Sequence, residues 1–341
     1  MIPGRNPLLL LLAPALLGAP VLLAPIATSA SPGDVEKCEA GDADACVTAA
    51  LEFQTGRGAP RDPERAVKLY GRACDAGSGV GCSNLGAMYL SGEGIPADPK
   101  KGIALFEKAC AASPGACFNL ALALGTGTGV PQDLARAASL YAKACDAGNV
   151  LACNNLGTAY GNGRGVEKDE KRAAVAYGKA CDGGDAVACT NLGRQLALGL
   201  GVAEDLPRAA ALFEKGCAAS VVAACELLAS SNENGTGVAK DLPRAGELYE
   251  KACDGGAASA CYSGGYLFAS TPGVPRDVPR AARMYRRGCD AGDAYCCANL
   301  GFFYEVGEFV PQDPAKAAEL LGQGCKGGVQ EACDALEARK K

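Results

Sequence analysis

Pairs of cysteines recur along almost the whole chain at a fixed spacing. The second member usually follows the first by eight positions, and successive first members are 36 residues apart, except for one interval of 35. A period of this length is typical of proteins built from similar units that pack only on their neighbours. The chain is therefore best interpreted as a repeat array. Cys296 is left over when the cysteines are paired as Cys38 with Cys46, Cys74 with Cys82, Cys110 with Cys117, Cys145 with Cys153, Cys181 with Cys189, Cys217 with Cys225, Cys253 with Cys261, Cys289 with Cys297 and Cys325 with Cys333.

The first half of each unit has the pattern of an amphipathic helix, here named helix A. We number eight full repeats by their second cysteine, from Cys46 to Cys297, and set that cysteine as position 0. Positions 0, +3, +4 and +7 carry Cys, Leu, Gly and an aromatic residue in the clearest copies, such as Cys153, Leu156, Gly157 and Tyr160. This spacing predicts one apolar stripe on a helix, with a glycine that lets a partner helix approach closely.

The second half of each unit predicts another helix, here named helix B. Glycines near +10 and +12 end helix A, and an aspartate at +16 stands where a helix N-cap belongs. These aspartates are Asp62, Asp98, Asp133, Asp169, Asp205, Asp241, Asp277 and Asp313. The aromatic residues at +24 are expected in the core, and they are Tyr70, Phe106, Tyr141, Tyr177, Phe213, Tyr249 and Tyr285. Each repeat is thus an antiparallel helix pair, and the predicted fold class is an all-α solenoid.

The paired cysteines are best explained as disulfides. Eight residues on one straight helix span about 12 Å, too far for a disulfide, but the Asp-Ala-Gly turn between helix B and the next helix A can bring the sulfurs together. A Cys-x-x-Cys redox motif and histidine are both absent from the sequence. Zinc needs four ligands, and neighbouring pairs should lie on the order of 20 Å apart. We therefore expect nine disulfides and no metal. Helix register favours Cys289–Cys297, which leaves Cys296 as a free thiol that could form an intermolecular disulfide.

The first thirty residues differ from the rest. Arg5 precedes an apolar run from Leu8 to Ile26, and Thr28-Ser29-Ala30 precedes a polar stretch. This order is typical of a secretory signal peptide cleaved near Ala30. We therefore expect residues 1–30 to be removed and residues 31–341 to form a single solenoid of eight full units with capping half-repeats. The expected location is extracytoplasmic, either periplasmic or secreted, with no membrane insertion after cleavage.

The unit ACxNLGxxYxxGxGVxxDxxRAAxLYxKAC resembles the Sel1-like repeat, a relative of the tetratricopeptide repeat. Its Cys-x7-Cys staple is similar to that of the Helicobacter cysteine-rich proteins. The resemblance covers residues 34–341 and implies a superhelical array whose inner surface binds proteins or peptides. The departures from the pattern are the short pair of Cys110 and Cys117, Thr271 and Phe309 in place of glycines, Asn232 in place of the aromatic at +7, and Leu321 in place of Tyr or Phe.

The same resemblance implies an alternative function, because some cysteine-rich members are penicillin-binding proteins or weak β-lactamases. Serine enzymes of that class need Ser-x-x-Lys and Lys-Thr-Gly motifs, and neither occurs in this sequence. The absence of histidine also removes Ser-His-Asp and histidine-rich zinc sites. The sequence therefore favours a binding scaffold without a catalytic residue or cofactor over an enzyme. The net charge of −5 and the lack of a basic cluster argue against a nucleic-acid partner.

Two sets of helix A residues are candidates for contact with a protein or peptide partner. The first is the series of amides at +2, which can both donate and accept hydrogen bonds: Asn84, Asn119, Asn155, Asn191 and Asn299. A bond to a neighbouring loop is the alternative for these. The second set lies in repeats 7 and 8, at +1, +5 and +6, where we expect exposure to solvent: Tyr262, Tyr266, Leu267, Phe302 and Phe303. The alternative for this second set is burial under the C-terminal half-repeat, Cys325 to Lys341, as a cap.

Overall fold

The computed structural model describes residues 33–307 and 310–339. The signal peptide expected at residues 1–30 lies outside the described residues. The described chain consists of α-helices, one 3-10 turn (Pro114–Ala116) and loops, with no strand, as predicted for an all-α fold. The helices are α1 (Gly33–Glu39), α2 (Ala43–Thr55), α3 (Pro63–Asp75), α4 (Gly79–Ser91), α5 (Pro99–Ala112), α6 (Cys117–Thr126), α7 (Leu134–Asp146), α8 (Val150–Asn162), α9 (Glu170–Asp182), α10 (Ala186–Leu198), α11 (Leu206–Ala218), α12 (Val222–Asn234), α13 (Leu242–Asp254), α14 (Ala258–Ser270), α15 (Val278–Asp290), α16 (Ala294–Val306), α17 (Pro314–Lys326) and α18 (Gln330–Ala338).

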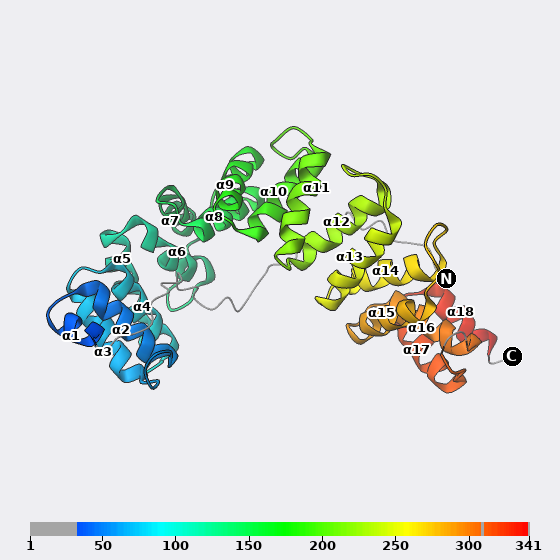
Figure 1. The fold of residues 1–341 in the computed structure, drawn as a ribbon, viewed down its shortest axis with the longest axis horizontal. Coiled ribbons are helices and arrows are strands. Elements are labelled where there is room, and N and C mark those ends of the chain that lie inside the picture. Colours follow the sequence, from blue (N-terminus) through cyan, green and yellow to red (C-terminus); the bar gives the residue numbers. More distant parts are fainter. Residues whose placement is uncertain (1–32, 308–309, 340–341) are drawn as a thin grey trace. The chain divides into compact units, whose positions relative to one another are not determined.

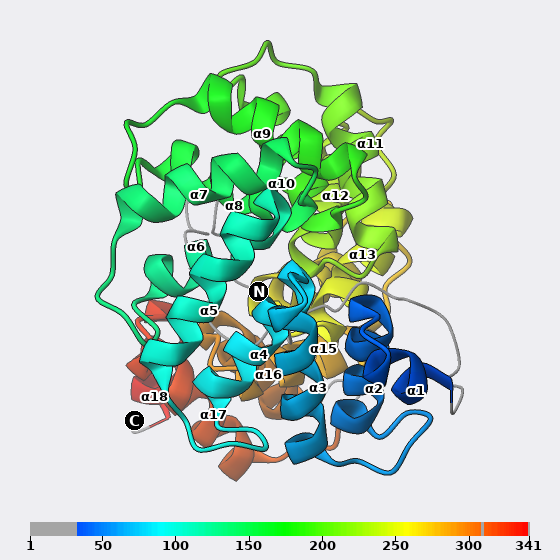
Figure 2. The same cartoon turned by 90° about the vertical axis from the view of Figure 1, so that its left-hand side faces the viewer.

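The described residues fall into two compact units, one up to Ala188 and one from Cys189 onward. In the first unit, helices A and B of each repeat pack as the pairs α2/α3, α4/α5, α6/α7 and α8/α9, and the helices B α3, α5 and α7 also pack on the next helix A (Figures 1 and 2). The second unit repeats this arrangement with α12/α13, α14/α15 and α16/α17. Packing between adjacent helices confirms the solenoid prediction.

The helix boundaries follow from capping chemistry. Each aspartate at +16 accepts a hydrogen bond on Oδ1 from the backbone N–H three residues later, with N···O distances of 2.9–3.1 Å. The N-cap prediction is confirmed. Most helices A end on a left-handed glycine, such as Gly163 with φ 66°. Thr271 replaces that glycine after α14, and the chain leaves the helix extended (φ −81°) because a β-branched residue avoids positive φ.

A glycine–tyrosine contact joins the two helices of a repeat. A Cβ added to Gly157 on α8 would lie 2.6 Å from Tyr177 Cδ1 on α9, and one added to Gly265 on α14 would lie 2.6 Å from Tyr285 Cε1 on α15. Both distances are far below van der Waals contact, so only glycine allows the ring to lie on the helix A backbone. The +24 aromatic residues are all buried, as predicted.

Disulfides close the turn between each helix B and the next helix A, as predicted. In eight of the expected pairs the two Cα atoms are 4.2–4.7 Å apart: Cys38 with Cys46, Cys74 with Cys82, Cys110 with Cys117, Cys145 with Cys153, Cys217 with Cys225, Cys253 with Cys261, Cys289 with Cys297 and Cys325 with Cys333. Cys181 and Cys189 are disulfide-bonded as well. In the chain-entropy account, closing a loop of this length stabilises the fold by about 2.5 kcal/mol. Disulfides throughout the array indicate an oxidising, extracytoplasmic environment.

Helix A is buried over a wider arc than the single apolar stripe predicts. Position +6 belongs to the core: Leu267 is 1% exposed, Phe303 is 5% exposed, and Met88 in repeat 2 is fully buried. The reason is that helix A packs on two helices, its own helix B and that of the preceding repeat, as α14 does between α13 and α15. The prediction that Leu267 and Phe303 face solvent is therefore wrong.

Candidate functional site

Three tyrosines from two successive helices A lie together in the second unit. Tyr262 and Tyr266 are one turn apart on α14, with ring centroids 6.4 Å apart and planes inclined by 26°. Tyr295, at the start of α16, places its ring centroid 5.6 Å from that of Tyr262. All three side chains are half-buried. We name Tyr262, Tyr266 and Tyr295 the tyrosine cluster.

A fourth tyrosine lies beneath the cluster. Tyr285 on α15 is fully buried, and its ring centroid is 6.5 Å from that of Tyr262. Its hydroxyl has no hydrogen-bond partner among the described residues. Burial raises the pKa of this hydroxyl well above its usual value, and Cys296, Tyr262 and Tyr266 raise it further. A buried hydroxyl without a partner is costly, and it marks repeat 7 as unusual.

Other repeats satisfy the tyrosine at this register with a polar side chain from their own helix A. Tyr70 donates to Gln54 Oε1 at 3.0 Å in repeat 1, and Tyr249 donates to Glu233 Oε2 at 2.7 Å in repeat 6. In repeat 4 the acceptor is Thr158 at position +5, the position that Tyr266 occupies in repeat 7. Tyr266 thus occupies the position that supplies the partner in repeat 4, whereas the partners in repeats 1 and 6 lie at +8, which is Ala269 in repeat 7.

A carboxylate borders the tyrosine cluster. Asp293 is the N-cap of α16, where its Oδ1 accepts a hydrogen bond from Cys296 N–H at 2.8 Å. Burial raises the pKa of Tyr262 to about 12, and Tyr266, Cys296, Tyr295 and Asp293 add to this by disfavouring a second negative charge. Of these four neighbours, only the Asp293 carboxylate carries a charge near neutral pH.

Phe302 lies at the same register as Tyr266 but has a different environment. It is half-buried and packs against the cluster that contains Leu321, Val329 and Ala332, which belong to α17 and the C-terminal half-repeat. Tyr295 packs against the same apolar cluster. The C-terminal cap considered as an alternative therefore accounts for part of the burial of Phe302.

The amides at +2 do not form one continuous exposed row. Asn84 and Asn299 are 7% and 1% exposed, so the expectation of partner contact is wrong for these two. Asn299 donates to the Tyr295 carbonyl at 2.9 Å, and half-buried Asn119 donates to Ser83 Oγ at 2.8 Å, so both bond to helices and not to loops. Asn155 and Asn191 are half-buried as well. Helix A packs between two neighbours, and this again explains why the +2 face is covered.

Stacking of a basic side chain on an aromatic ring recurs between helices A and B of one repeat, and we did not predict it. The residue at +19 lies over the ring at +7, with 4.1–5.6 Å from the charged group to the ring centroid. The pairs are Arg65/Phe53, Lys101/Tyr89, Arg172/Tyr160, Arg280/Phe268 and Lys316/Tyr304. The signal was present in the sequence as a basic residue at +19 in every repeat.

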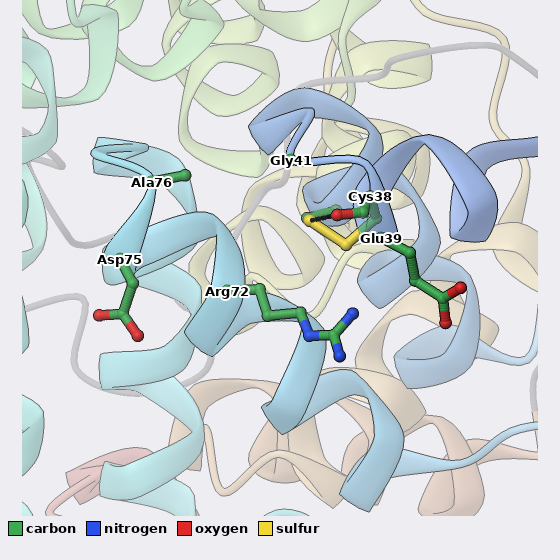
Figure 3. Close-up of a pocket in the computed structure, with 7 residues that line it drawn as sticks. Cys38, Glu39, Gly41, Arg72, Asp75 and Ala76 are labelled. Carbon is green, nitrogen blue, oxygen red and sulfur yellow. Dashed lines mark hydrogen bonds between the residues drawn. A yellow bond between two sulfur atoms is a disulfide. The ribbon is translucent and has the colours of Figure 1, made fainter.

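Two open cavities lie at disulfide staples of the first unit. The larger, about 480 Å³, lies beside the Cys38–Cys46 disulfide, and in the view of Figure 3 the Arg72 side chain extends between Glu39 and Asp75. Lys179 is the equivalent of Arg72 in a later repeat, since both lie two positions before the first cysteine of a pair. The Lys179 Nζ atom forms an ion pair with Asp146 Oδ1 at 3.0 Å.

The smaller cavity, about 260 Å³, is lined by the buried Leu156, the half-buried Tyr160 and the exposed Lys171 and Val175, among others. Neither cavity brings together a nucleophile and a base. Across residues 33–307 and 310–339, no three metal-ligating side chains are grouped as they would be around an ion, and no helix has the length and apolar character needed to cross a bilayer.

Cys296 has the environment of a core residue. It is unpaired and fully buried, and burial together with Asp293 raises the pKa of its thiol. A Cβ added to Gly288 would lie 2.9 Å from Cys296 Cβ, so this glycine makes room for the thiol. In repeat 4 the same position is Ala152, which is also fully buried. The burial contradicts the idea that Cys296 forms an intermolecular disulfide in the folded protein.

Comparison with known proteins places this architecture in a family. The sequence model of the Sel1 repeat matches residues 43–78, 79–113, 114–149, 150–185, 186–221, 222–256, 258–293 and 294–329. None of the curated proteins compared with the chain matches it.

Solved structures give the same assignment. A protective antigen of uropathogenic Escherichia coli with an SLR fold is 25% identical, with a TM-score of 0.81 over 90% of this chain; the match covers 66% of that antigen, just under two thirds of its length. A Sel1 repeat protein from Oxalobacter formigenes is 24% identical, with a TM-score of 0.68 over 90% of this chain and 89% of that one. Helicobacter pylori cysteine rich protein B is 33% identical over 38% of this chain and 93% of its own, with a TM-score of 0.32. Scaffolds of this kind are typical of proteins that interact with other proteins. The chain belongs to the Sel1 repeat family.

Proposed function

We propose that this Sel1 repeat protein is an exported, disulfide-stapled scaffold that binds a protein or peptide through the helix A surface of repeats 7 and 8. The observation that carries the proposal is the tyrosine cluster. Tyrosine rings supply large contact areas at low entropic cost and are enriched where interfaces concentrate their binding energy. The stability of the fold gives little reason to leave three neighbouring rings half-buried on two successive helices A.

Burial reduces the set of residues that can contact a partner on the surface proposed from the sequence. Leu267 and Phe303 support it from the core, whereas Tyr262 and Tyr266 keep exposed surface. Phe302 is a peripheral member, because the C-terminal cap covers part of it. Asn155 and Asn191 lie in other repeats and are proposed only as secondary contacts along the same face of helix A.

The disulfides support export, since they form and persist in oxidising compartments. Sequencing of the amino terminus of the protein recovered from its native host tests this directly. We expect the mature chain to begin close to Ser31. A chain that retains Met1 and carries free thiols at the paired cysteines would contradict export.

Photo-crosslinking tests the binding surface. A benzophenone amino acid placed at position 266 should give a covalent adduct with a partner protein in the native envelope fraction. The matched control is position 122, which is also at +5 of its repeat and holds Leu122, 42% exposed. Adducts at 122 but not at 266, or at neither, would count against the proposal.

A substitution separates binding from folding. Tyr266→Ser should reduce capture of the crosslinked partner at least tenfold while the melting temperature stays within about 2 °C, because the side chain is half-exposed. Leu122→Ser should leave capture unchanged. If Tyr266→Ser instead lowers the melting temperature strongly, the ring belongs to the core and the site is misplaced.

A further inference from the structure

The tyrosine cluster has the chemistry of a site for positive charge. The face of an aromatic ring carries negative electrostatic potential and attracts ammonium and guanidinium groups within about 6 Å of the ring centroid. Tyr262, Tyr266 and Tyr295 bring three such faces together on α14 and α16. Tyr262 lies between the other two rings, and the outer, half-buried surface of such a cluster can stack on a cationic side chain.

Asp293 adds a fixed negative charge to the same place. Its Oδ1 accepts the capping hydrogen bond from Cys296 N–H, and a carboxylate has lone pairs to accept more than one donor. The phenol oxygen of Tyr285, buried and without a partner, adds a further polar atom beneath the rings. An apolar ligand would cover the half-buried carboxylate without pairing it, which is costly. A cation pairs the carboxylate as it covers it.

The rest of the chain already uses this chemistry. In five repeats an arginine or lysine at +19 lies over the helix A ring at +7, and in repeat 7 itself Arg280 lies 4.1 Å from the centroid of the Phe268 ring. The ring of Tyr266 takes part in none of these five pairs. Rings at +7, three of them buried and two half-buried, are thus commonly covered by a cation from helix B of the same repeat, and at Tyr266 the cation can come from a partner.

From this geometry we infer that the tyrosine cluster and Asp293 bind an arginine or lysine side chain of the partner. The cationic group lies against the ring faces, and the Asp293 carboxylate supplies its counter-charge. This inference rests on the proposed function, because it names the ligand chemistry of the same surface. It defines the partner as a protein or peptide with an exposed basic residue.

A peptide library tests the inference. Random peptides displayed on phage are selected on the immobilised full-length protein with its disulfides intact, and the selected peptides are synthesised with a fluorescent label. Their affinities are measured by fluorescence polarisation for the wild type, Tyr266→Ser, Asp293→Asn and Asp42→Asn. Asn is as good an N-cap as Asp, so both Asp→Asn changes preserve their helices. Asp42 is the matched control, because it caps α2, the helix A of repeat 1, in the same way.

We expect peptides that depend on Tyr266 to share an arginine or lysine. Asp293→Asn should weaken these peptides about tenfold, Asp42→Asn should not, and norleucine in place of the basic residue should cause a similar loss. The losses of affinity caused by Asp293→Asn and by norleucine should not add when the two changes are combined, because both changes remove the same contact.

Other results overturn specific steps. Peptides that depend on Tyr266 but carry no basic residue, or that bind Asp293→Asn as tightly as the wild type, overturn the cation inference and leave the proposed function standing. Selected peptides that bind Tyr266→Ser as tightly as the wild type, or a library that yields no binder, overturn the proposed surface itself.

Discussion

Repeats 4 and 7 both pack a buried tyrosine at +24 against the glycine at +4, but the hydroxyl of this tyrosine has different surroundings in the two repeats. In repeat 4, the Tyr177 hydroxyl lies 3.2 Å from Thr158 Oγ1 and donates to it. In repeat 7, the Tyr285 hydroxyl has no partner within residues 33–307 and 310–339, and Tyr266 occupies the position of Thr158. The contacts Gly157/Tyr177 and Gly265/Tyr285 are otherwise equivalent.

The comparison shows how one position of a repeat can change without a change of fold. The contact between +4 and +24 holds the two helices together and is kept in both repeats. Position +5 lies at the edge of that contact, so it can carry a threonine that completes a hydrogen bond or a tyrosine that presents a ring. We infer that repeat 7 gives up a hydrogen bond at this edge in exchange for a binding surface.

The largest effect is expected from overfilling the shared contact. Gly157→Leu and Gly265→Leu should each lower the free energy of unfolding by about 3 kcal/mol or more, because the new side chain overlaps the tyrosine ring. Leucine is a good helix former, so the loss reports packing and not helix propensity. Urea denaturation with the disulfides intact measures it. Gly178→Leu is the control, since nothing lies within 4 Å of a Cβ at Gly178. Tolerance of the change in only one of the two repeats would break the comparison.

A smaller effect, of opposite sign in the two repeats, is expected from removing the hydroxyls. Tyr177→Phe should lower the free energy of unfolding by about 1 kcal/mol, because it removes a hydrogen bond. Tyr285→Phe should leave it unchanged or raise it, because it removes a buried polar group that has no partner. The difference between the two variants in urea denaturation is the measurement. An equal loss in both would mean that the Tyr285 hydroxyl is satisfied in solution, by water for example.

Caps, turns and disulfides set by residues close in the chain were predictable from the sequence, whereas the burial caused by a second packed helix was not. The N-cap at Asp169, the glycine at Gly157 and the disulfide Cys145–Cys153 depend on residues close in the chain, so their spacing identifies them. Leu267 and Asn299 were misplaced because a pattern for one helix contains no information about a second neighbour.

The composition of the candidate site was predictable only in part. Tyr262 and Tyr266 were singled out as unusual rings on helix A. Tyr295 precedes the apolar stripe of its helix, and only packing brings it to Tyr262. The lack of a hydrogen-bond partner for the Tyr285 hydroxyl could not be predicted from the sequence either, because it depends on all the side chains around that hydroxyl.

The stacked pairs at +7 and +19 should contribute less to the free energy of unfolding than the packing of the glycine does, and their contributions should differ between repeats 4 and 7. Arg280 lies 4.1 Å from the Phe268 centroid and its side chain is only 25% exposed, whereas Arg172 lies 5.6 Å from the Tyr160 centroid and is 68% exposed. Arg280→Gln should cost about 1 kcal/mol and Arg172→Gln only about 0.3 kcal/mol. Urea denaturation at low and high salt measures both. Equal costs would show that stacking geometry is not what distinguishes them.

The last change has the smallest effect at neutral pH, because it acts only in alkaline solution, where repeat 7 titrates and repeat 4 does not at the same register, Tyr262 against Asn154. Burial, followed by the neighbouring acidic groups, raises the pKa of Tyr262 to about 12, against about 10 in an unfolded chain. The neutral phenol is thus favoured by folding. Its contribution to stability is complete below pH 10 and is lost as the pH rises from about 10 to about 12. Tyr262→Phe should therefore show a shallower fall in melting temperature over that range, measured rapidly enough to keep the disulfides intact. An identical fall in the variant and the wild type would mean that Tyr262 titrates as a solvated phenol, and the tyrosine cluster would then be more open than its ring contacts indicate.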